Sequence, residues 1–181
     1  MARARIIPPV EVGGRRLHSR GAGTRYHPCV ASLVYLDLCC LKRSFDDQRS
    51  ARIQVETAAV AELVARAERG EIRMVRSPAH TFENDRNPRE DRRLATASWL
   101  DGASVGVALT EGAAARAREL KELGFSPLDA LHAAFAEASG AAWLATTDDR
   151  MIALGQRHAS RLRVKVANPT NLLQELTTGE P

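Results

Sequence analysis

The sequence has few aromatic residues and no long apolar run. Its 181 residues include two Trp, two Tyr and four Phe, so a core must be built mainly from Ala, Leu and Val. A chain of this length with 44% hydrophobic residues is sufficient for one globular domain. No apolar stretch approaches the roughly 20 residues that span a bilayer. Charge, Pro and Gly interrupt the first 20 residues too often for a signal peptide. We therefore expect a cytoplasmic protein without a membrane segment.

Cysteine is also scarce. Cys29 is isolated and Cys39 and Cys40 are adjacent, so the chain has neither a C-x-x-C pair nor an even disulfide framework. A structural zinc site needs four soft ligands, which this sequence does not supply. We interpret the adjacent pair as small buried apolar residues.

The positive charge of the chain is unevenly placed. The net charge of +4 comes from 26 basic and 22 acidic residues, and residues 1–30 alone hold six Arg and one Glu. The remaining 20 basic and 21 acidic residues give residues 31–181 a net charge of about −1. We predict a disordered basic extension over 1–30 and a folded domain over 31–181, so the pI of 9.3 is weak support for a nucleic-acid surface on the fold itself.

From residue 31 onward, short β-rich runs alternate with helical patterns. The expected strands are 33–36, 72–75, 105–109, 142–145 and 164–166. Expected helices cover 51–69, 110–123 and 149–157, and four Ser-Pro or Asn-Pro pairs predict further helix starts at Ser77, Asn87, Ser126 and Asn168. This order predicts an α/β fold with a largely parallel sheet and helices on both faces.

Four acidic residues stand at strand ends or on helices: Asp37, Glu83, Asp129 and Asp148. Open α/β sheets place their ligand sites at the carboxyl ends of the strands. Carboxylates that converge there repel one another unless a cation joins them, and Mg²⁺ or Mn²⁺ prefers oxygen ligands. The pattern therefore points to metal-dependent phosphodiester chemistry, in which Thr146 would hold a phosphate or a metal-bound water.

Each of these acids also has a simpler structural interpretation. Asp37 could be a turn or cap residue that opens the segment Leu41–Asp47. Glu83 could be a surface glutamate, with Asp85 as the alternative ligand, since these two side chains lie nearly opposite on a helix. Asp129 is the third residue after Ser126 and could complete a capping box, and Asp148 could cap the helix at 149–157. His132 follows Asp129 by three residues, and a lone histidine is more often a packed residue than a catalyst.

Several segments resemble the PIN-domain family of small metal-dependent nucleases, which includes the VapC-type toxins of toxin–antitoxin pairs. The matching segments are LVYLDLCCLKRSFDD, TFEN, SPLDALHAAFAEA, WLATTDDRMI and VKVANPTNLLQEL, and the resemblance spans about residues 34–176. DALHAA and TTDDR are the most specific of them. One departure is that Leu38 and Cys39 stand where relatives carry a small polar residue and often an Asn.

This resemblance implies a three-layer α/β/α PIN-like fold and a metal-dependent endoribonuclease. It makes Asp37, Glu83, Asp129 and Asp148 the ligands of Mg²⁺ or Mn²⁺, with Thr146 as the associated hydroxyl residue. It also implies an RNA substrate, an antitoxin protein as partner and a homodimer.

Two other functions compete with this interpretation. A HAD-like phosphatase would also use an acid at the end of a strand, but it needs a second acid two residues later, where Cys39 stands. It also needs a lysine on a later loop, and Lys121 and Lys165 are poorly placed. The other alternative is a non-catalytic PIN-like module that binds RNA or a protein, which the presence of all four acids disfavours.

Overall fold

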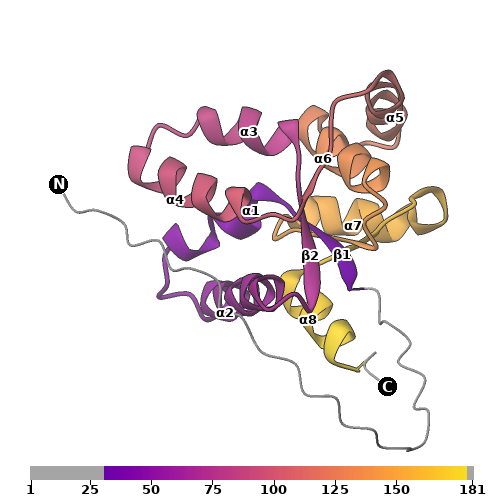
Figure 1. The fold of residues 1–181 in the computed structure, drawn as a ribbon. Helices are drawn as coiled ribbons and strands as arrows, with labels where there is room; N and C mark the ends of the chain where they lie inside the picture. Colours follow the sequence, from indigo (N-terminus) through magenta and orange to yellow (C-terminus); the bar gives the residue numbers. More distant parts are fainter. Residues whose placement is uncertain (1–30, 179–181) are drawn as a thin grey trace, which may run out of the picture.

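The structure is a computed structural model that describes residues 31–178. The predicted basic extension at residues 1–30 therefore lies outside the described residues. The elements follow in the order β1 (Ser32–Leu36), α1 (Leu38–Leu41), η1 (Arg43–Phe45), α2 (Ala51–Glu68), β2 (Ile72–Arg76), α3 (Pro78–Asp85), α4 (Glu90–Asp101), β3 (Val105–Gly106), α5 (Glu111–Glu122), α6 (Pro127–Ala138), β4 (Trp143–Ala145), α7 (Asp149–Arg157), η2 (Ala159–Arg161), β5 (Lys165–Ala167) and α8 (Pro169–Thr178). Figure 1 shows their arrangement. None of the helices among these residues is both long and apolar enough to cross a membrane.

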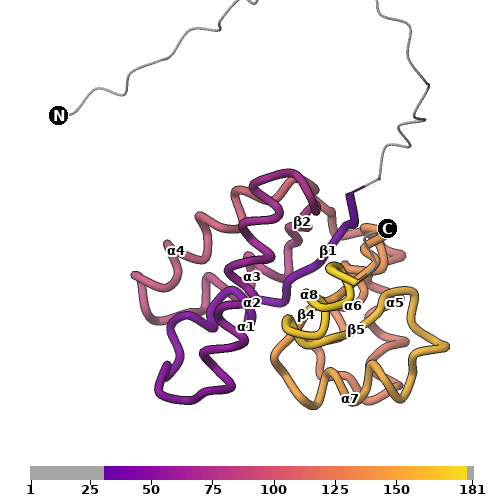
Figure 2. The backbone as a smooth tube through the Cα atoms, turned by 90° about the horizontal axis from the view of Figure 1, so that it is seen from below, coloured from indigo at the N-terminus to yellow at the C-terminus, as the bar shows by residue number. Residues whose placement is uncertain are grey.

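The five strands form one parallel sheet in the order β3-β2-β1-β4-β5. β1 therefore lies at the centre, paired with β2 on one side and with β4 on the other. In the view of Figure 2, α1 to α4 lie on the β2 side of β1 and α5 to α7 on its β4 side, whereas α8 packs against α2. The central strand thus pairs with two strands, β2 and β4, that lie far apart in the sequence.

Alternate residues of β1 enter two separate cores, which makes the fold a three-layer α/β/α sandwich. Leu33 and Tyr35 pack with side chains from α5, α6 and α7. Val34 and Leu36 pack with side chains from α1, α2, α4 and α8. The predicted fold class is confirmed.

Three of the four predicted helix starts at Ser-Pro or Asn-Pro pairs are correct. Ser77 and Ser126 accept hydrogen bonds from the backbone N–H three residues later, and Asn168 accepts one from Thr170. The prediction for Asn87 is wrong, because α4 begins only at Glu90. The Asn87 carboxamide oxygen accepts from the N–H of Arg89 at 3.0 Å and so forms a local turn before the helix.

Two further predictions needed correction. The third strand was expected over 105–109, but β3 contains only Val105 and Gly106. The spacing of Leu128, Leu131, Phe135 and Ala138 predicts a buried apolar stripe on the helix after Ser126. On α6, however, Ala138 is exposed, whereas His132 and the small residues Ala130, Ala133 and Ala134 are buried. The tightly packed face of α6 is thus made of alanines, because α5 lies against it.

A buried ion-pair network fixes the segment that follows α1. Glu56 on α2 is 2% exposed and its carboxylate accepts from Arg43 Nε at 2.6 Å, from Arg52 Nε at 2.9 Å and from Asn168 Nδ2 at 2.7 Å. The network therefore ties η1 and α8 to α2. A carboxylate this deeply buried requires such partners.

We predict that Gly155→Ala on α7 destabilises the fold by about 1–3 kcal/mol, because overpacking a filled core forces its neighbours to shift. A Cβ at Gly155 would lie 2.5 Å from Cβ of Val166 on β5. Urea unfolding measures the effect. The control is Gly112→Ala on α5, where the nearest atom would be 3.8 Å away, so this variant should be as stable as the wild type or more so. Equal stability of both variants would contradict the close packing of α7 on β5.

Candidate metal centre

The candidate site begins at the carboxyl end of β1, where Asp37 follows the strand directly. The Asp37 N–H donates to the carbonyl of Ala145 at 2.9 Å, so the central strand pairing continues into this residue. Its side chain is buried, with the residue 6% exposed. A buried carboxylate must be paired or bound to a cation, as the sequence predicted for this position.

Two neighbours hold one oxygen of the Asp37 carboxylate. The hydroxyl of Thr146, which follows β4, donates to Oδ2 at 2.8 Å, and the thiol of Cys39 donates to the same oxygen at 3.1 Å. Because Oδ2 is fixed in this way, Oδ1 is left for other partners. Thr146 is fully buried, and its contact with Asp37 gives it a positioning role.

Cys39 differs from the sequence prediction that both adjacent cysteines are buried apolar residues. Cys40 is buried and donates its thiol to the carbonyl of Ala145 at 3.3 Å. Cys39 is partly exposed, contacts Asp37, and accepts from the N–H of Thr147 at 3.3 Å. A thiol therefore occupies one of the two positions after Asp37 where the family resemblance led us to expect a small polar residue and often an Asn.

Glu83 on α3 and His132 on α6 complete a three-residue cluster with Asp37. One possible ligand atom from each residue lies within 4.8 Å of the other two. The Nε2 of His132 is 3.1 Å from Glu83 Oε2 and 3.7 Å from Asp37 Oδ1. Two carboxylates and an imidazole at this spacing fit a divalent cation such as Mn²⁺ or Mg²⁺. The sequence pattern predicted the two carboxylates but not His132.

A chain of buried hydrogen bonds fixes the imidazole of His132 from behind. The Nδ1 of His132 lies 2.7 Å from the Tyr35 hydroxyl, which lies 2.6 Å from Ser77 Oγ. Ser77 contacts Nδ1 of His80 at 3.3 Å, and His80 Nε2 donates to the Leu36 carbonyl at 2.8 Å. Because a carbonyl only accepts, this last contact fixes the tautomer of neutral His80.

The pKa values in the site indicate a buried ion pair. Burial alone lowers the pKa of His132, but the charges of Asp37 and Glu83 raise it above its ordinary value. Burial alone raises the pKa of Asp37, but the charge of His132 and the donors Cys39 and Thr146 lower it below its ordinary value. His80 is different, because burial and the charge of His132 lower its pKa to about 4.

When His132 is charged, each group in this chain of buried hydrogen bonds can donate to the next. Both of its ring nitrogens then donate, with Nδ1–H directed to the Tyr35 hydroxyl. Tyr35 can in turn donate to Ser77, and Ser77 to neutral His80. The imidazole of His132 is thus held in one orientation towards the carboxylates.

The other two predicted acids lie outside this three-residue cluster. Among residues 31–178, the Asp129 carboxylate has no hydrogen-bond or ion-pair partner, although its charge contributes to the raised pKa of His132 one turn along α6. Asp148 is exposed and caps α7, because its Oδ1 accepts from the N–H of Arg150 at 2.8 Å and of Met151 at 3.1 Å. A ligand role for these two residues stays a prediction.

Asp148→Asn separates the two roles that the sequence left open. Asn caps helices about as well as Asp, so the stability of the variant should stay within about 0.5 kcal/mol of the wild type. As a metal ligand, Asn would be much weaker than a carboxylate. We expect Mn²⁺ affinity, measured by calorimetry, to fall about tenfold or more if the free oxygen of Asp148 contributes. An unchanged affinity would leave Asp148 with the cap alone.

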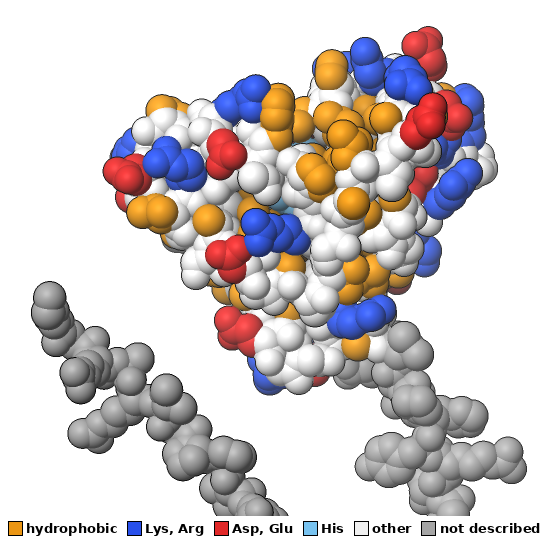
Figure 3. Space-filling view, turned by 45° about the horizontal axis from the view of Figure 1, so that its top comes forward, with side chains coloured by type: hydrophobic (Ala, Val, Ile, Leu, Met, Phe, Trp, Pro, Cys, Tyr) orange, Lys and Arg blue, Asp and Glu red, His pale blue; other side chains and the backbone are white. Residues whose placement is uncertain are grey.

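Helices α3 and α6, which carry Glu83 and His132, lie at the top of Figure 1, and this side is turned forward in Figure 3. Basic and acidic side chains both lie on this face, with hydrophobic and uncharged surface between them.

A family model of the PIN domain matches residues 40–156. This chain belongs to the PIN domain family. The match covers more than half of the 181 residues and includes Glu83, Asp129, His132 and Asp148. It begins after Asp37, which joins the site through the geometry described above. None of the curated proteins compared with the chain matches it.

Family membership indicates a metal-dependent nuclease, and the cluster of Asp37, Glu83 and His132 gives this PIN domain a place that could bind the metal. The phosphatase alternative loses its support, because the family is a nuclease family and Cys39 donates to Asp37 instead of providing a second acid.

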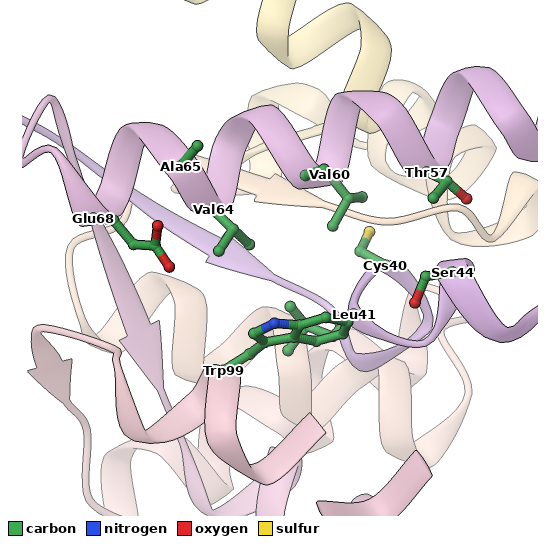
Figure 4. A pocket seen from close by; sticks show the side chains of 10 residues that line it. Cys40, Leu41, Ser44, Thr57, Val60, Val64, Ala65, Glu68 and Trp99 are labelled. Atoms are coloured by element: carbon green, nitrogen blue, oxygen red, sulfur yellow. The ribbon is translucent and has the colours of Figure 1, made fainter. Parts of the chain in front are cut away.

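A separate cavity of this PIN domain lies away from the acidic cluster. A cavity of about 260 Å³ opens between α2 and α4, where Trp99 faces Val60 and Val64 (Figure 4). Its lining is mostly apolar, and it contains none of the predicted site residues. We therefore place the chemistry at the acidic cluster and not in this cavity, because phosphodiester hydrolysis requires charged groups.

Proposed function

We propose that this PIN domain is a metal-dependent endoribonuclease that hydrolyses RNA phosphodiester bonds. The observation that carries the proposal is the convergence of Asp37, Glu83 and His132, whose ligand atoms lie within 4.8 Å of one another at the carboxyl ends of the strands. Asp129 and Asp148 would complete the acidic set, with Thr146 as the positioning hydroxyl.

Asp37 and Glu83 would hold the cation in this mechanism, and His132 would join them only as a neutral imidazole, so metal binding would release its proton. Bound Mg²⁺ or Mn²⁺ would supply a Lewis acid that lowers the pKa of the attacking water and neutralises charge on the phosphate. Thr146 and Cys39 keep Oδ2 of Asp37 fixed, so Oδ1 is oriented before any ligand arrives. Such preorganisation reduces the reorganisation that the reaction would otherwise require.

The proposal extends to the toxin of a toxin–antitoxin pair, and it rests there on the resemblance to VapC-type toxins. The expected partners are RNA, an antitoxin protein and a second copy of the chain. Exposed apolar side chains on α3 and after β3 support a further protein contact, since Phe82 is 51% and Leu109 is 60% exposed. Growth arrest on expression, relieved by a neighbouring gene, would test the toxin role.

The nuclease activity is tested by incubating labelled structured RNA with the purified protein in Mn²⁺, in Mg²⁺ and in EDTA. We expect cleavage with metal, none with EDTA, and recovery when metal is returned in excess. A DNA strand of the same sequence tests the preference for RNA, and p-nitrophenyl phosphate tests the phosphatase. Cleavage that persists in EDTA would contradict the proposal. RNA binding by a folded protein that cleaves with no metal would instead support the non-catalytic module.

A further inference from the structure

Two cationic side chains occupy the two oxygens of Glu83. The ammonium of Lys42 donates to Oε1 at 2.9 Å, and Nε2 of His132 contacts Oε2 at 3.1 Å. Burial alone would raise the pKa of Glu83, but these two contacts hold it below its ordinary value. A divalent cation that uses Glu83 therefore competes with one of the two side chains.

These two side chains differ in their freedom to move. His132 is 1% exposed and its other nitrogen is held by Tyr35. The side chain of Lys42 is 22% exposed, and Glu83 is the one partner of its ammonium among residues 31–178. Its charge sits on a flexible four-carbon stem. Lys42 is thus the side chain that can leave Glu83 without disturbing the core.

The backbone keeps Lys42 beside the site after its ammonium has left Glu83. The N–H of Lys42 donates to the Leu38 carbonyl at 3.0 Å, and its own carbonyl accepts from Phe45 at 2.9 Å. The side chain of Lys42 is already 22% exposed, so its ammonium can turn towards solvent, from where an RNA phosphate would approach.

We propose that Lys42 contacts the scissile phosphate of RNA once its ammonium has been released from Glu83. This inference rests on the proposed nuclease function. In the metal-free protein Lys42 neutralises Glu83, and in the loaded protein it donates to a non-bridging phosphate oxygen. Charge on the transferring phosphoryl oxygens is what lysine and arginine clamps stabilise in the transition state.

The proposal differs in its consequences from a role as counter-ion alone. Removing Lys42 frees Glu83, so metal affinity should be unchanged or higher. Loss of one donor to the transition state should lower kcat/KM by about 10²-fold. Loss of one phosphate contact should also flatten the slope of log kcat/KM against log salt by about 0.7. If Lys42 were only the counter-ion of Glu83, its removal would change metal affinity without changing the cleavage rate at saturating metal or the salt slope of kcat/KM.

Lys42→Met tests this, with Lys42→Arg as the charge-conserving variant. Lys121→Met, an exposed lysine on α5, is the matched control. Calorimetry gives the Mn²⁺ affinity, and cleavage of labelled RNA at several salt concentrations gives kcat/KM and its slope. We expect Lys42→Met to bind Mn²⁺ at least as tightly as the wild type, to cleave about 10²-fold more slowly and to show the flatter slope. Lys42→Arg should recover part of the rate, and Lys121→Met should behave as the wild type.

Three results would overturn the inference. Cleavage by Lys42→Met at the wild-type rate would leave the nuclease intact and remove Lys42 from its chemistry. A parallel loss of Mn²⁺ affinity and cleavage would show that Lys42 only supports the metal centre. Wild-type protein that binds no Mn²⁺ and cleaves no RNA would refute the nuclease function and the role of Lys42 together.

Discussion

Asp37→Asn is expected to lower metal-dependent RNA cleavage on the order of 10³-fold. The substitution removes the negative charge that a cation requires, while the amide keeps the shape of the side chain. Its oxygen can still accept from the Thr146 hydroxyl, so the contact with the loop after β4 survives. Single-turnover cleavage with Mn²⁺ measures the effect, and circular dichroism verifies the fold.

The matched control for this prediction is Asp101→Asn at the end of α4. Its carboxylate is exposed and pairs with Arg76 away from the cluster, so cleavage should change less than about twofold. Because both variants are prepared in the same way, a contaminating nuclease would give equal rates in both. An Asp37→Asn protein that cleaves at the wild-type rate would exclude Asp37 from the site.

His132→Leu is expected to destabilise the metal-free protein by about 3–5 kcal/mol, because it leaves the carboxylates of Asp37 and Glu83 without their buried cationic partner. The pKa of His132 is raised in the folded protein, so its contribution is fully present below its ordinary pKa of about 6.5. That contribution is lost as the pH rises through the folded pKa. In urea unfolding with EDTA, the difference in the free energy of unfolding between variant and wild type should therefore be largest below a pH of about 6.5. It should become smaller as the pH rises through the pKa of His132 in the folded protein.

Mn²⁺ provides the decisive comparison for His132→Leu. The carboxylates of Asp37 and Glu83 remain in this variant, and Mn²⁺ bound to them would replace the missing positive charge, so the stability lost in EDTA should be partly recovered at saturating Mn²⁺. His158→Leu at the end of α7 is the control and should change stability by less than about 1 kcal/mol, since it is only partly buried. A loss of stability that neither pH nor Mn²⁺ alters would mean that His132 serves packing alone.

The parts of the fold that the sequence predicted correctly depend on interactions between residues that are close together in the chain. The apolar run before Asp37 marks the central strand, and the Ser-Pro pairs mark helices because capping is a local interaction. The Asn87-Pro88 pair failed although Asn87 accepts from the N–H two residues ahead, as Asn168 does, so this local contact alone does not determine where a helix begins.

The remainder of the site could not be predicted because its contacts join distant segments. His132 meets Tyr35 across 97 residues and Glu83 across 49. Lys42 reaches Glu83 across 41 residues. The spacing of Asp129 and His132 on one helix face was a usable signal, but periodicity alone cannot show which partners face that helix.

The central position of β1 also has a consequence for synthesis. Asp37 depends on Thr146, which lies 109 residues later in the chain. At translation rates of about 5–20 residues per second, roughly 5–20 s pass between the synthesis of Asp37 and that of Thr146. His132 also follows Asp37 late in translation. A nascent chain therefore carries the first acid long before the rest of the centre exists, so the cluster of Asp37, Glu83 and His132 can assemble only when translation of the domain is nearly complete.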